Sequence, residues 1–134
     1  MKNYYQIKEM GYVLPHPIYR KTVNTIRAYN FYRSISNRED EDGEINRSLE
    51  GEAVALAAVN SASVDYYIDA IHTALSKYVI EEYREPVFRH LVDAVEYFEL
   101  ERDHGISAST LKRWVQRWVF GVATELGENY FDEC

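Results

Sequence analysis

Residues 104–121 read HGISASTLKRWVQRWVFG, and this stretch predicts a turn followed by an amphipathic helix. Gly105 suits the left-handed backbone conformation that ends one helix and redirects the chain. Ser107 or Ser109 can accept a hydrogen bond from an unpaired N–H at the start of the next helix. A short helix, a turn that contains glycine and a second helix at a steep angle form a helix-turn-helix. We expect this unit over about residues 86–126.

The helix after this turn has an apolar side and a polar side. At about 100° per residue, the apolar side carries Leu111, Val115, Trp118 and Val122. The polar side carries Ser109, Thr110, Lys112, Arg113, Gln116 and Arg117. Such a helix fits the major groove of DNA and can offer these side chains to base edges and phosphates. Ser109 and Thr110, beside free N–H groups at the helix start, suit a phosphate contact. The alternative interpretation is a polar face that only solvates the helix.

The rest of the chain also predicts helices. Pro17 suits a first helical position, and Pro86 suits the start of a later helix with Val87 and Leu91 facing inward. Residues 52–78 contain no Gly or Pro and predict one long helix or two shorter ones. No strand-like alternation competes. The predicted fold is therefore all-α: a small helical bundle with a C-terminal helix-turn-helix and an N-terminal helical arm.

Charge divides the chain into three parts. The whole chain carries 15 Lys and Arg against 22 Asp and Glu, a net charge of −7, but residues 1–38 hold seven bases and one acid. We expect a basic N-terminal helical arm over residues 1–38, an acidic linker over 39–51 and a helical domain over 52–134. Since local patches steer polyanions more than net charge does, Arg20, Lys21 and Arg27 are candidate accessory phosphate contacts. A solvated helix face explains these bases equally well.

The sequence argues against a disulfide-bonded protein, a membrane protein, a metal site and an enzyme. Cys134 is the one cysteine, so a disulfide within the chain is impossible. No apolar run approaches the roughly 20 residues that span a bilayer, and the first residues lack the apolar core of a signal peptide, which predicts a soluble intracellular protein without a membrane partner. The four histidines are scattered, and no nucleophile motif or phosphate-binding glycine loop is present. We therefore predict no enzyme activity, no catalytic residue, no metal site and no cofactor.

A family resemblance rests on two motifs. The run GISASTLKRW (residues 105–114), together with VATELGE (residues 122–128), resembles the C-terminus of RinA-like and ArpU-like phage regulators of late transcription. Residues 67–78 and 86–95 resemble helices of sigma-factor region 4, and the resemblance covers about residues 63–128. It implies an activator, encoded by a phage or prophage and present in the bacterial cytoplasm. Such an activator binds double-stranded promoter DNA ahead of packaging and morphogenesis genes and acts with host RNA polymerase. Carried over by position, the reading residues are Ser109, Thr110, Lys112, Arg113, Gln116 and Arg117. Because residues 107–117 would dock in the major groove, Ser107 is predicted as a DNA-binding residue as well.

Two alternative functions remain open from the sequence. A phage packaging protein of the small-terminase type also uses a helix-turn-helix, and it predicts a large ring in solution. A helical adaptor that binds only proteins suits the acidic linker and the negative net charge, and it predicts no DNA binding even at low salt. The sequence leaves homo-oligomerisation open.

Overall fold

The described part of the chain is helical throughout. This computed structural model describes residues 5–40 and 51–127, and it describes side chains over residues 5–36 and 63–127. A short 3-10 helix and six α-helices succeed one another: η1 (Lys8–Met10), α1 (His16–Arg27), α2 (Tyr29–Asp40), α3 (Gly51–Tyr78), α4 (Glu81–Leu91), α5 (Tyr97–His104) and α6 (Ala108–Glu125). Over these residues there is no strand, so the predicted all-α class is confirmed. None of the helices described is long and apolar enough to cross a membrane.

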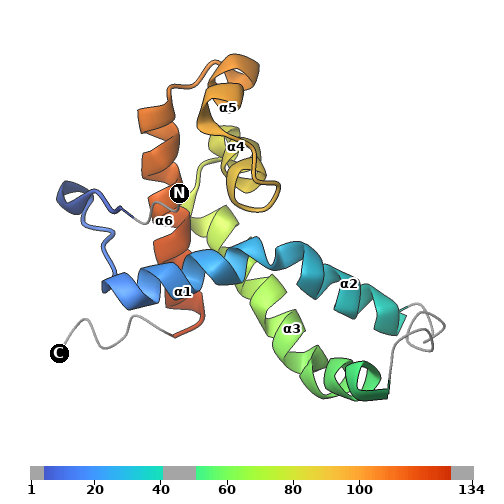
Figure 1. Cartoon of the computed structure of the whole chain (residues 1–134). Coiled ribbons are helices and arrows are strands. Elements are labelled where there is room, and N and C mark those ends of the chain that lie inside the picture. Colours follow the sequence, from blue (N-terminus) through green and yellow to red (C-terminus); the bar gives the residue numbers. More distant parts are fainter. Residues whose placement is uncertain (1–4, 41–50, 128–134) are drawn as a thin grey trace.

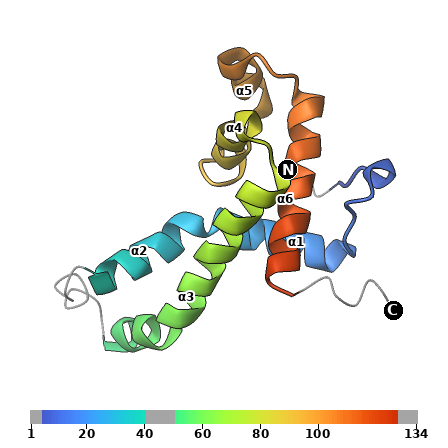
Figure 2. The ribbon, with the colours of Figure 1, turned by 180° about the vertical axis from the view of Figure 1, so that it is seen from behind.

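Helix α6 is the centre of the arrangement. It packs against α1, α3, α4 and α5, while α2 packs along α3. Figure 1 shows α1 crossing α6, with α4 and α5 beside the first half of α6. Figure 2, from behind, shows α3 running away from α6 together with α2, so that this pair of helices projects from the rest of the fold. The start of α6 therefore lies at the end of the molecule opposite to the projecting pair.

The apolar side of α6 is buried as its periodicity predicts. Leu111, Val115, Trp118 and Val122 are all buried, and the Trp118 indole N–H donates to the carbonyl of Ile71 in α3 at 3.1 Å. Residues 16–36 contribute to the same core, through Tyr19, Val23, Ile26, Tyr29 and Ile35. The N-terminal helices that we expected as an arm thus share one core with α3, α4 and α6.

The structure decides whether α3 is one helix or two, and it places the start of α4 earlier than expected. Helix α3 is continuous over 28 residues, so the Ser63 region does not divide it. Helix α4 begins at Glu81, and Pro86 lies inside it rather than at its start, which makes the prediction from Pro86 wrong. The actual start has two carboxylates, Glu81 and Glu82, in its first turn, where they stabilise the positive end of the helix dipole.

The boundary between α3 and α4 has a further local cause. The Arg84 guanidinium donates from Nε to the Val79 carbonyl at 2.7 Å and from its Nη2 to the Ser76 carbonyl at 3.0 Å. A basic side chain that satisfies the last carbonyls of a helix stabilises its C-terminal end. Arg84 therefore joins the end of α3 to the first turns of α4. The predicted acidic linker falls largely on residues 41–50, outside the described residues; residues 39 and 40 end α2, and Gly51 begins α3.

Candidate nucleic-acid interface

The turn before α6 has the predicted backbone geometry and capping. Gly105 has a φ of 69°, in the left-handed region, and its N–H donates to the Glu101 carbonyl at 2.8 Å. Ser107 is the N-cap of α6, and its Oγ accepts from the Thr110 N–H at 3.2 Å. The connection between α5 and α6 is thus only three residues long, residues 105–107.

Two of the N–H groups at the start of α6, those of Ala108 and Thr110, are not free, contrary to the expectation. The Ala108 N–H donates to the Glu101 carboxylate at 2.5 Å, and the Thr110 N–H is held by Ser107. The Ser107 hydroxyl also donates to the Thr110 Oγ1 at 3.0 Å, so these two hydroxyls serve the cap. A phosphate at this helix end would have to compete with the negative charge of Glu101, which the helix dipole already attracts. The side chains further along α6 are therefore the better anion ligands.

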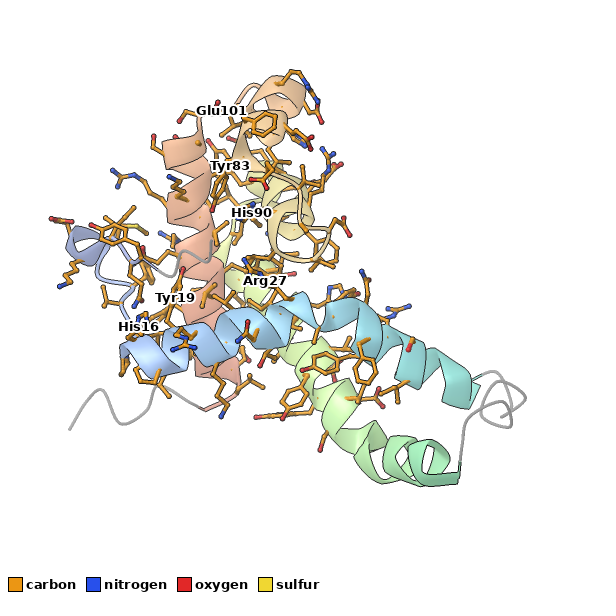
Figure 3. All side chains as sticks on the ribbon, in the orientation of Figure 1. His16, Tyr19, Arg27, Tyr83, His90 and Glu101 are labelled. Carbon is orange, nitrogen blue, oxygen red and sulfur yellow. The ribbon has the colours of Figure 1, made fainter. Side chains whose placement is uncertain are left out.

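Two basic residues on α6 are exposed where the sequence places them. Lys112 and Arg113 lie on the solvent side, and together with Ser109 they line a groove of about 840 Å³. Arg27 of α1 lines the same groove, and so do residues 90–97, which run from the end of α4 to the start of α5. Figure 3 shows Arg27 and Tyr19 on α1 below His90, in the angle between α1 and the upper helices. We call this feature the cationic groove.

The charges in the cationic groove favour an anion. Among the described residues, the charged side chains that line it are Arg27, Lys112, Arg113 and Glu96, with Glu96 the single carboxylate. Two aromatic rings line it as well: the rings of His90 and Tyr97 are stacked with centroids 3.8 Å apart, and the Lys112 Nζ lies 5.5 Å from the Tyr97 centroid. Burial raises the pKa of Tyr19 to about 12 and raises that of Tyr97 further, against the opposing charge of Arg27. Both phenols therefore stay neutral and add no negative charge to the groove.

Gln116 is not an exposed reading residue, which corrects the sequence prediction. Its side chain is 2% exposed because residues 5–14, which we call the N-terminal strap, lie over it. Its Oε1 accepts from the Ile7 N–H at 2.6 Å, and its Nε2 donates to the carbonyls of Ile7 at 3.0 Å and Tyr12 at 2.7 Å. The carboxamide thus has partners on both its atoms, and it holds the strap rather than facing solvent.

Arg117 is also engaged within the fold. Its guanidinium lies 4.5 Å from the centroid of Tyr12 and 4.8 Å from that of Trp114, and its Nε donates to the Tyr78 carbonyl at 3.1 Å. Phe120, which the periodicity places near the polar side, packs edge-on against Tyr12 at 5.3 Å. The strap therefore covers the second half of the face that was expected to be polar and open. The exposed part of that face ends at Arg113.

We expect Gln116→Ala to loosen the strap without unfolding α6. The variant removes the acceptor for the Ile7 N–H and two donors, so amide hydrogen exchange at Ile7 should become at least about tenfold faster, equivalent to about 1.4 kcal/mol of local stability. Gln6→Ala is the matched control, because within the described residues the Gln6 side chain bonds the Leu14 backbone, and its loss leaves the bonds between Ile7 and Gln116 in place. Unchanged protection of Ile7 in Gln116→Ala would show that Gln116 does not hold the strap.

Of the three bases predicted on α1, one lines the groove, and three residues that were not predicted line it as well. Arg20 and Lys21 are exposed on α1 and do not line the groove, whereas Arg27 does. His90, Tyr97 and Tyr19 line the groove and were not predicted, because they come from three elements and share no motif. No cluster of His, Cys, Asp and Glu within the described residues could hold a metal ion.

Comparison with known proteins identifies no relative of this chain. No protein-family model matches the chain, and neither the curated proteins nor the solved structures contain a match to it.

Proposed function

We propose that this chain is a transcription regulator, encoded by a phage or prophage, that binds double-stranded promoter DNA with α6 and the cationic groove. The observation that carries the proposal is the exposure of Lys112 and Arg113 on α6, on the same groove as Arg27. Three cations from two helices that line one groove can contact phosphates of a duplex. The resemblance of residues 63–128 to activators of late phage genes supports the promoter as the target.

The exposed face of α6 limits how this contact can be made. Ser109, Lys112 and Arg113 lie within about one and a half turns of the helix, and the strap covers the next turn on the same face. We therefore propose that these three side chains read the base edges, while the hydroxyls of Ser107 and Thr110 cap the helix. Gln116 and Arg117 are left out of the interface, and Arg27 is the accessory phosphate contact from α1.

We expect Lys112→Ala and Arg113→Ala each to weaken binding to promoter duplex about tenfold at low salt, because each removes one phosphate or base contact. A lost phosphate contact should also reduce the slope of log affinity against log salt by about one. Electrophoretic retardation or fluorescence anisotropy measures the affinity and its salt dependence, with DNA taken from upstream of the genes that neighbour the gene for this chain. Helicity by circular dichroism should stay the same.

Arg33→Ala is the matched control, because Arg33 is exposed on α2, in the projecting pair of helices away from the groove. Its affinity should stay within about twofold of the parent. An equal loss in Arg33→Ala would mean that net charge, not the groove, determines binding. No retardation of any duplex at low salt would favour the protein-binding adaptor, and a large ring by light scattering would favour the packaging protein.

A further inference from the structure

His90 lines the cationic groove, and its hydrogen bond to the backbone determines which of its ring nitrogens carries the hydrogen. Its Nδ1 lies 2.8 Å from the Val95 carbonyl oxygen. Because a carbonyl oxygen only accepts, Nδ1 carries the hydrogen, and Nε2 is the nitrogen that gains a proton when the ring becomes charged. The ring is half-buried, it lines the groove, and its stacking on Tyr97 holds it in place there.

The groups around His90 disfavour the charged form of its ring when no anion is bound. Burial is the largest cause that lowers the pKa of His90, and the bond to Val95 opposes it. Arg27 from α1 and Lys112 from α6 lower that pKa further, while Glu96 raises it. Tyr97 from α5 and Tyr19 from α1 stay neutral because burial raises the pKa of each. Arg113 of α6 and Tyr5 of the strap are the other titratable groups that line the groove.

We infer that the cationic groove is a proton-linked phosphate site, in which His90 takes up a proton from solvent as a phosphate group binds near Arg27 and Lys112. An anion there offsets the two positive charges that now disfavour the imidazolium. The protonated ring can then donate from Nε2 to a phosphate oxygen, as a charge-assisted hydrogen bond. This inference rests on the proposed function only for the source of the phosphate, the DNA backbone.

Linkage gives the direction of the pH effect. When bound phosphate raises the pKa of His90, affinity is greatest below the pKa of the free protein and falls as pH rises towards the pKa of the complex. Above both values the affinity no longer changes. For a difference of about one pKa unit between the two states, the whole change is about tenfold.

The experiment monitors the His90 ring by NMR in the full chain, with His90→Gln used for assignment. The pKa of His90 is measured without phosphate, with inorganic phosphate and with promoter duplex, and duplex affinity is measured between about pH 5.5 and pH 8. We expect the pKa to rise by about one unit with either ligand, and duplex affinity to rise about tenfold as pH falls. In His90→Gln, whose amide can still donate to Val95, the affinity should become independent of pH. His104→Gln, which removes a histidine on α5 beside Arg89, should keep the pH dependence.

The outcomes separate this inference from the proposed function. Duplex retardation with an unchanged His90 pKa would overturn the proton-linked site and leave the regulator proposal standing. A raised His90 pKa with inorganic phosphate but no retardation of duplex would support the site and overturn DNA as its ligand. Because the pKa is read in the unmodified chain, the test remains decisive even when a variant folds poorly.

Discussion

Trp118→Ala should lower the free energy of unfolding by about 3–5 kcal/mol, the loss typical of a large aromatic residue removed from a core. Trp118 is fully buried at the point where α6 crosses α3. Its indole donates to the Ile71 carbonyl, and its ring stacks with Phe88 of α4 at a centroid distance of 6.1 Å. One side chain thus joins three helices, and its removal leaves a cavity between them.

Urea unfolding monitored by circular dichroism measures this loss, and two variants serve as controls. Trp118→Phe keeps most of the ring and removes the indole donor, so it should cost much less than Trp118→Ala. Trp114→Ala removes the same residue type from a half-buried site, where the ring stacks on Tyr83 at 5.1 Å. A loss in Trp118→Ala no larger than that in Trp114→Ala would contradict the central role of Trp118.

Gly121→Val should destabilise the fold by about 3 kcal/mol, at or above the upper end of what overpacking usually costs. A Cβ at Gly121 would lie closer than any real Cβ contact to the Tyr78 ring at the end of α3. The Tyr78 ring packs against Phe120 with centroids 6.3 Å apart, so moving it away from a new Cβ would disturb that contact. The absence of a side chain at Gly121 therefore permits the close approach of α3 and α6.

A double-mutant cycle tests whether Tyr78 is the cause. Gly121→Ala alone should destabilise, since even one methyl group meets the ring. In a Tyr78→Leu background the same change should become neutral or stabilising, because alanine is favoured over glycine in a helix by about 1 kcal/mol. The same loss in both backgrounds would show that the contact with Tyr78 is not what excludes a side chain.

Local patterns predicted the parts of the fold that depend on neighbours in sequence. The apolar stripe of α6, the left-handed Gly105 and the Ser107 cap each involve residues within a few positions of one another. The prediction from Pro86 was wrong because the start of α4 is set elsewhere. The first-turn carboxylates and Arg84, which reaches back to the end of α3, place it at Glu81.

The candidate site was predicted only in part, and the reason is distance along the chain. The period of one helix predicts Lys112 and Arg113 on the exposed side, where the structure has them. The same period places Gln116 on that side too, but Gln116 is buried there by Ile7, which lies 109 positions away in the sequence. The groove likewise combines Arg27, His90 and Lys112 from three elements, and no local pattern indicates such an association.

The bond between Ile7 and Gln116 has a consequence for how the protein is made. A ribosome adds roughly 5–20 residues per second, so about 5–20 s separate the synthesis of Ile7 from that of Gln116. During that interval Tyr12 lacks its partners on α6, and Leu14 lacks part of its core. The strap therefore reaches its final place only after α6 has been translated, although it is made about a hundred residues earlier.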